Sequence, residues 1–109
     1  MDINEPDWKV FRKLRDLALE RYCQRVLREV QLTVDKTGGS YHDRYLKLWE
    51  LLRNRDKTIA VASNDPRRSQ AIIQLLNIVA EDLLTHEELN QFSEDTRERI
   101  EGITRSRDS

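Results

Sequence analysis

Apolar residues recur every three or four positions from residue 5 to residue 34, which is the spacing of one helical face. Set about 100° apart on a helical projection, they form one continuous arc opposite charged and amide side chains. The pattern predicts an amphipathic helix capped by Asn4, with Pro6 in its first turn. At about 1.5 Å per residue it would be roughly 45 Å long, so it would bend or extend beyond a compact body. The arc consists of Trp8, Phe11, Leu14, Ala18, Leu19, Tyr22, Cys23, Val26 and Val30.

A second helix is predicted after a break at Gly38 and Gly39, which allow positive φ. Ser40 caps this helix, and the apolar pattern continues to residue 62 or 63. Because the connecting loop is short, the two helices should be antiparallel neighbours. The polar stretch 53–57 is interpreted as exposed helix, with a break as the alternative. An apolar face about 160° wide is formed by Tyr41, Tyr45, Leu48, Trp49, Leu51, Leu52 and Ile59.

The most apolar segment, residues 71–84, is predicted to be the central and most buried helix. Its start signal lies a few residues earlier, with Asp65 as the cap and Pro66 at the first helical position. Apolar residues cover more than half of its circumference, so at least two other helices should contact it.

Two short helices are predicted to close the molecule. Thr85 and Glu88 form a capping box that opens a helix through about Phe92, and Ser93 then caps a helix over 94–104. Residues 105–109 are predicted to be a flexible tail. The fold class is therefore all-α: one domain over 1–104, a small helical bundle of three main helices plus two short C-terminal helices.

Composition supports this fold class and narrows the classes of function. Three Gly and two Pro are too few for a turn-rich β protein, and a single Cys excludes an internal disulfide framework and a multi-cysteine zinc site. Charge interrupts the first apolar run every few residues, so we expect neither a signal peptide nor a membrane span. The resulting prediction is a soluble, cytoplasmic protein.

Charge is divided unevenly along a chain whose net charge is -1. Residues 1–57 hold 13 basic and 10 acidic residues, a net charge of +3, whereas residues 58–109 hold 6 basic and 10 acidic residues, a net charge of -4. Two interpretations stay open. The charges form solvated faces, or the molecule is dipolar and docks on itself or on a charged protein.

The groups that could carry chemistry are few. His42 and His86 each fall in the first turn of a predicted helix and belong to no metal-ligand spacing. Cys23 lies on an apolar arc, where a buried thiol is inert. Gly38 and Gly39 lack the following Lys and Ser or Thr of a phosphate-binding loop. We therefore expect a non-enzymatic protein without a cofactor or a metal.

The leading functional prediction is a protein-interaction module that binds another protein or a second copy of itself. The start of the first helix carries more apolar surface than a chain of this length can readily cover. The candidate partner-binding residues there are Trp8, Phe11, Leu14 and Leu17. For Trp8, a place in the core is the alternative.

The alternative function is a nucleic-acid-associated regulator. Its candidate anion or nucleic-acid contacts are Arg53, Arg55, Lys57, Arg67 and Arg68. Phosphate binding needs such cations to converge on one surface, and the net charge of -1 adds no long-range attraction. Nucleic acid is thus the less favoured partner, and salt-sensitive retention on heparin would distinguish the two functions.

Overall fold

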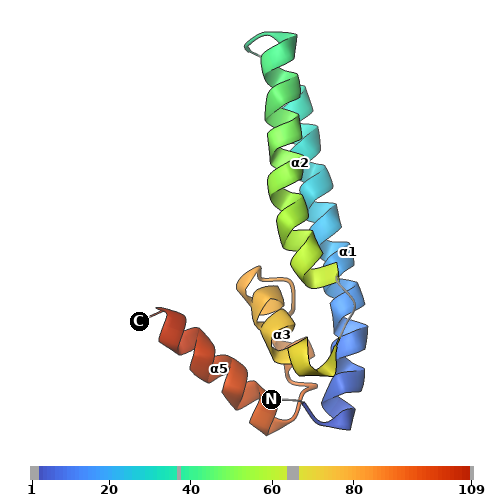
Figure 1. The fold of residues 1–109 in the computed structure, drawn as a ribbon, viewed down its shortest axis with the longest axis vertical. Helices are drawn as coiled ribbons and strands as arrows, with labels where there is room; N and C mark the ends of the chain where they lie inside the picture. The colour runs from blue at the N-terminus through green and yellow to red at the C-terminus, as the bar shows by residue number, and fades with distance from the viewer. Residues whose placement is uncertain (1–2, 37, 64–66, 109) are drawn as a thin grey trace.

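The computed structural model describes residues 3–36, 38–63 and 67–108, with the backbone alone at 60–63 and 105–108. These residues form helices and no strand, which confirms the predicted all-α class. In chain order (Figure 1), the elements are α1 (Glu5–Asp35), α2 (Tyr41–Ser63), the 3-10 turn η1 (Arg68–Gln70), α3 (Ala71–Ala80), α4 (His86–Leu89) and α5 (Glu94–Asp108).

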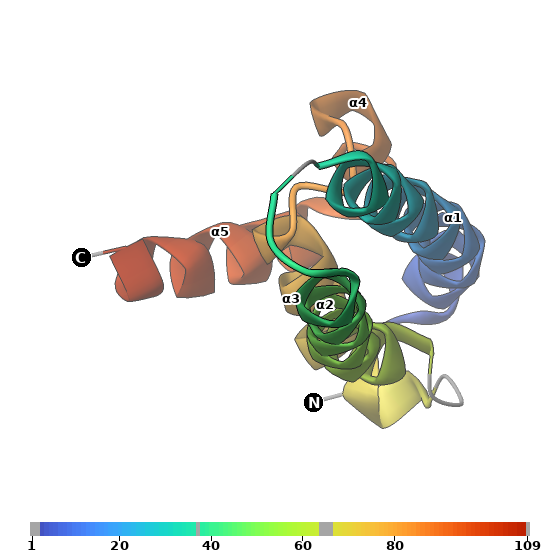
Figure 2. The ribbon, with the colours of Figure 1, turned by 90° about the horizontal axis from the view of Figure 1, so that it is seen from above.

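The helices α1 and α2 form a long antiparallel hairpin, as the short loop between them predicts (Figure 1). The molecule measures 53 × 31 × 23 Å, and α3, α4 and α5 gather near the end of the hairpin that holds the start of α1. Seen along the hairpin, these three helices all lie on one side of α1 and α2 (Figure 2). Towards its tip, the other side of the hairpin is left uncovered by the described elements.

The loop between α1 and α2 has the predicted geometry. Gly38 and Gly39 adopt φ values of 117° and 78°, which are positive as expected. The hydroxyl of Ser40 accepts a hydrogen bond from the backbone N–H of Asp43 at 3.0 Å and so caps α2. The helix then continues without interruption across 53–57, so that polar stretch is exposed helix rather than a break.

The third helix begins later than its sequence signal suggests. The predicted cap at Asp65 and Pro66 lies outside the described residues, and α3 itself begins only after the η1 turn. It contacts α1, α2 and α5, which confirms its predicted central position. Its buried residues are Ala71, Gln74, Leu75, Leu76 and Ile78.

A Schellman motif ends α3 at Ala80, earlier than predicted. Asp82 adopts a left-handed conformation with φ 56°. Its N–H donates to the carbonyl of Val79 at 3.0 Å, and the N–H of Leu83 donates to the carbonyl of Ile78 at 3.3 Å. Apolar residues beyond the motif are buried although they are not helical, which explains why their pattern resembled a continued helix.

The two C-terminal helices differ in length from the prediction. The capping box is confirmed, since the hydroxyl of Thr85 accepts from the N–H of Glu88 at 3.1 Å and the Glu88 carboxylate accepts from the N–H of Thr85 at 2.8 Å. However, α4 is a single turn that ends at Leu89. The helix α5 ends at Asp108, four residues later than predicted, and neither Gly nor Pro follows Gly102 to stop it earlier.

Candidate protein-interaction surface

The predicted partner residues at the start of α1 belong mostly to the core. Phe11 and Leu14 are 0% and 2% exposed, because the C-terminal elements fold back onto this half of α1. The expectation that these two side chains form an uncovered surface is therefore wrong. Trp8 is half-buried and stacks on Phe11, with 5.7 Å between the ring centroids. Leu17 is 37% exposed and lies apart from the core.

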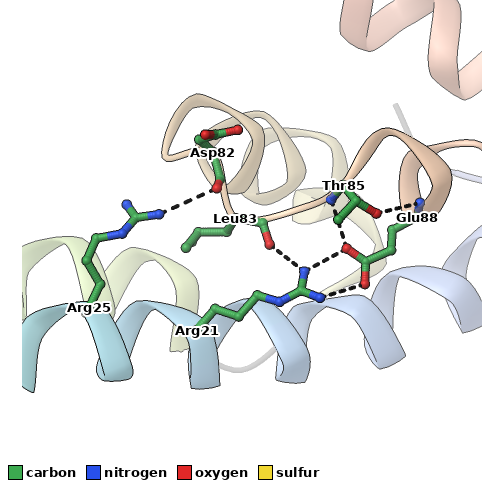
Figure 3. A network of polar contacts seen from close by, with 6 residues as sticks. All are labelled: Arg21, Arg25, Asp82, Leu83, Thr85 and Glu88. Atoms are coloured by element: carbon green, nitrogen blue, oxygen red, sulfur yellow. Dashed lines mark hydrogen bonds and ion pairs between the residues drawn. The ribbon is translucent and has the colours of Figure 1, made fainter.

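A polar network anchors the C-terminal elements to α1 (Figure 3). Arg21 donates two hydrogen bonds to the carboxylate of Glu88, at 2.6 and 3.0 Å, and a third to the carbonyl of Leu83 at 2.8 Å. One turn further along α1, Arg25 donates to the carbonyls of Glu81 and Asp82 at 2.9 and 3.4 Å. These two arginines hold the segment that joins α3 to α4 against one side of α1.

The same contacts determine the ionisation of Glu88. Hydrogen bonds from Arg21, joined by one from the backbone N–H of Thr85, lower the pKa of Glu88 from 4.5 to about 2. The contact with Glu88 also raises the pKa of Arg21. Both groups are therefore charged at neutral pH, and the pair acts as a fixed link between α1 and α4.

The helix α2 is poorly covered by the rest of the chain. None of its described side chains, residues 41–59, is fully buried. It is joined to α1 by the pair of Arg55 and Glu29, with N···O distances of 2.9 and 3.1 Å, and by the hydroxyl of Tyr22, which donates to the carbonyl of Arg55 at 3.3 Å. Since α1 covers only part of the broad apolar face predicted for α2, the rest of that face reaches solvent.

Among the described side chains of the hairpin, six apolar residues are exposed on one side, and we name them the open face. Two of them lie two turns apart on α1, and four follow one another at helical spacing along α2. Their exposed fractions run from 44% to 86%, and none carries a charge. The open face consists of Leu27, Val34, Tyr41, Tyr45, Trp49 and Leu52.

Contacts place the open face on the side of the hairpin away from α3. On α1, Arg25 reaches the end of α3, and Leu27 lies about 160° around the helix from it. On α2, Thr58 lines a cleft shared with α3, whereas Trp49 and Leu52 line a separate groove with α1. The end-on view agrees, because the C-terminal helices all lie on the other side of the hairpin (Figure 2).

The groove on the open face has a volume of about 340 Å³. Its lining residues are Val26, Trp49, Leu52, Arg53, Arg55, Asp56 and Ile59. The guanidinium carbon of Arg53 lies 4.8 Å from the centroid of the Trp49 ring, which is a cation–π contact. The surface thus combines an apolar groove with exposed aromatic rings and an arginine, the residue types that dominate binding energy in protein interfaces.

One exposed leucine lies on the opposite side of the hairpin. Leu32 follows Arg25 by two helical turns and therefore points to the side on which α3 lies. It is 66% exposed, the same fraction as Leu27. The two leucines lie on the same helix and are equally exposed, but they are on different faces of it. They are therefore a matched pair for experiments.

The structure does not gather the five basic residues of the nucleic-acid alternative. On α2, Arg55 pairs with Glu29, and this contact raises the pKa of Arg55 and lowers the pKa of Glu29. Arg53 stacks on Trp49 on the open face, whereas Lys57 lines the cleft on the side of α3. Arg55 is therefore directed towards α1, while Arg53 and Lys57, which are one helical turn apart, line different hollows.

The other two basic residues of that alternative lie at the start of η1. Arg68 donates to the carbonyl of Ile3 at 2.8 Å and to the carboxylate of Glu5 at 2.9 Å, so it ties η1 to the start of α1. Arg67 is exposed. The function in nucleic-acid regulation stays a prediction, and this arrangement offers it no surface of converging cations.

The groups considered for catalysis lie far apart along the fold. His42 is exposed at the start of α2, His86 is exposed at the start of α4, and Cys23 is half-buried on α1 rather than fully buried as expected. Among the described residues, no three His, Cys, Asp or Glu side chains are placed to hold a metal ion together. No helix of the described chain combines the length and the apolar character needed to cross a membrane.

Comparison with known proteins found no matching family model, no matching curated protein and no matching solved structure.

Sequence reasoning placed four residues of the open face on the apolar face of the second helix but assigned them no function. The signal available in the sequence was the width of that apolar face. An apolar face about 160° wide exceeds what one antiparallel neighbour covers, so part of it must meet a further element or solvent. On α1, Leu27 and Val34 lie outside the main apolar arc, and only the position of α2 shows that they extend the same surface.

Proposed function

We propose that the protein is a non-enzymatic interaction module that binds a protein chain through the open face. The proposal is carried by the exposure of α2. No side chain over 41–59 is fully buried, and Tyr41, Tyr45 and Trp49 are exposed on one side of the helix. Covering such rings removes apolar surface from water, which is the main favourable contribution to protein association.

The rigid base of the hairpin supports the same function. Arg21 and Arg25 fix the C-terminal elements to one side of α1, and the pair of Arg55 and Glu29 fixes α2 to α1. The open face is thereby presented in a defined geometry without a rearrangement. A surface ordered before binding loses less conformational entropy when a partner docks.

The test is site-specific photo-crosslinking in the cells that produce the protein. A benzophenone amino acid replaces Tyr45 on the open face or, as the matched control, Lys47, which is exposed and lies about 160° away around α2. We expect a covalent adduct several times more abundant from position 45 than from position 47, and its loss when Trp49→Asp is added.

Mass spectrometry identifies the protein in the adduct, and its binding is then reconstituted from purified components. Adducts that are absent from position 45, or equally abundant at both positions, would contradict the proposal.

A further inference from the structure

We propose that the chain which covers the open face is a second copy of this protein, with the two hairpins running antiparallel. This inference rests on the proposed function and specifies its partner. The pair would form a four-helix arrangement in which α2 buries the apolar residues that a single chain leaves in water.

The area of the open face suits such a pair. The exposed fractions of its six residues correspond to an uncovered area on the order of 700 Å², given that a large aromatic side chain covers roughly 150–250 Å². A standard interface covers about 800 Å² of each partner, whereas the largest apolar patch of a typical monomer is roughly 300–600 Å². One copy therefore offers nearly the area that each member of a stable pair contributes.

The charges around the open face favour a partner with the same face. The six residues are uncharged, and three charged residues line the groove. Arg55 is paired with Glu29, and the other two, Arg53 and Asp56, are of opposite sign. Two copies can meet there without bringing large like charges together. A strongly charged protein or an anionic bilayer would find no row of complementary charges on this surface.

The rest of α1 determines the orientation of the two hairpins. Arg12 and Asp16 lie about five turns before Val30 and Val34, so they continue the same side of α1 towards the base of the hairpin. A parallel pair would hold each of these charges level with its own copy, across the diagonal of the four helices, where like charges repel. In an antiparallel pair only the tip halves meet, and the charged halves extend past each other.

The register within the hairpin predicts which rings meet. Arg44 donates to the carbonyl of Val34, and the hydroxyl of Tyr22 donates to the carbonyl of Arg55. These contacts place Trp49 near the level of position 29 of α1 and Tyr45 near the level of position 33. A two-fold axis through the middle of the open face falls between these levels, so Trp49 of each copy meets Tyr45 of the other.

Sedimentation equilibrium of the purified full chain over a wide concentration range tests the pairing. The wild type is compared with Leu27→Asp and with Leu32→Asp, which change equally exposed leucines on opposite sides of α1. We expect the wild type and Leu32→Asp to dimerise with dissociation constants within about threefold of each other. The dissociation constant of Leu27→Asp should be at least about tenfold higher than that of the wild type. Circular dichroism shows whether all three chains stay helical.

Either of two results overturns the inference: a wild type that stays monomeric throughout, or a Leu32→Asp variant that dissociates as readily as Leu27→Asp. If the wild type is monomeric while the crosslinker at position 45 captures a different protein whose binding is reconstituted, the proposed function stands and the second copy is ruled out as its partner.

Distances between spin labels test the orientation. A label is attached at Asp16→Cys in a Cys23→Ser background, about fifteen residues from the expected axis along α1. At about 1.5 Å per residue, an antiparallel pair separates the two labels by about 45 Å. A parallel pair would bring them within about 20 Å, because packed helices lie roughly 10 Å apart. The short distance, or loss of the dimer on labelling, would contradict the antiparallel arrangement.

Discussion

The hydroxyl of Thr96 donates a hydrogen bond to the carboxylate of Asp7 at 2.6 Å, and both residues are 2% exposed. The same carboxylate accepts from the hydroxyl and the backbone N–H of Ser93, at 2.6 and 2.8 Å. A single acid in the first turn of α1 thus satisfies polar groups at the start of α5, although the two segments lie at opposite ends of the chain. This contact closes the base from which the hairpin projects.

Replacing Asp7 with Ala should lower the free energy of unfolding by about 3 kcal/mol, because three hydrogen bonds to a charged acceptor are lost and the hydroxyl of Thr96 is left buried. Urea unfolding at one fixed protein concentration measures the change. Asp16→Ala is the control, since this acid is exposed on the same helix. Equal stability of the two variants would show that the buried carboxylate contributes nothing beyond an exposed one.

The ionisation of Asp7 makes the free energy of unfolding depend on pH. Burial alone would raise its pKa, but the hydrogen bonds from Ser93 and Thr96 outweigh burial and leave the pKa lowered. A lowered pKa in the folded state means that the carboxylate stabilises the fold above the ordinary Asp value, and that this contribution is lost as the pH falls through the lowered value. The difference in stability between wild type and Asp7→Ala should therefore shrink in strong acid.

The link between Arg21 and Glu88 predicts a second contribution to the free energy of unfolding that is lost in acid, over a defined range of pH. Since the pKa of Glu88 falls from 4.5 to about 2 on folding, its contribution is complete above about pH 4.5 and disappears by about pH 2. Glu88→Gln should lower the free energy of unfolding at pH 7 by about 1–2 kcal/mol, as expected for the loss of a charge-assisted hydrogen bond. Wild type and variant should converge as the pH approaches 2.

Urea unfolding at several pH values between 7 and 2 follows that convergence. Glu87→Gln provides the control, because its side chain is exposed and adjacent in sequence. A difference between wild type and Glu88→Gln that stays constant with pH would contradict the assigned role of the carboxylate.

Local signals in the sequence predicted most of the helices, because caps and breakers act over three or four residues. Ser40, Thr85 and Gly38 each serve the role that their residue type suggests. The end of α3 was predicted too late, since a Schellman motif at Asp82, without glycine, leaves no signal in an apolar segment.

The site was harder to predict than the helices, because it depends on which faces the fold covers. Phe11 and Leu17 both looked like candidates for an interface, but only the folding of the C-terminal elements onto α1 decides which is buried. Leu27 and Tyr45 join one surface only when the hairpin register is known. Helical periodicity describes a face and not the element that packs against it.

The left-handed conformation of Asp82 predicts a stabilising substitution. Any residue with a Cβ atom is disfavoured at φ 56°, and glycine adopts this region without strain. Asp82→Gly should raise the free energy of unfolding by up to about 1 kcal/mol, because the contacts of Arg25 with this segment use backbone carbonyls that remain. Asp82→Val should destabilise the protein instead. Thermal unfolding measures both, and a destabilising glycine would show that the Asp82 side chain contributes more than its conformation costs.

The contrast between Phe11 and Leu17 predicts how the start of α1 responds to truncation. Phe11→Ala should lower the free energy of unfolding by about 3–5 kcal/mol, because it removes a ring that is fully buried in the core. Leu17→Ala should cost less than about 1 kcal/mol, since its side chain is 37% exposed and leaves no closed cavity. Urea unfolding at a fixed protein concentration separates the two variants. If Phe11→Ala unfolded at the wild-type midpoint but lost self-association, the ring would belong to an interface, and the division between the core at the base of the hairpin and the open face at its tip would fail.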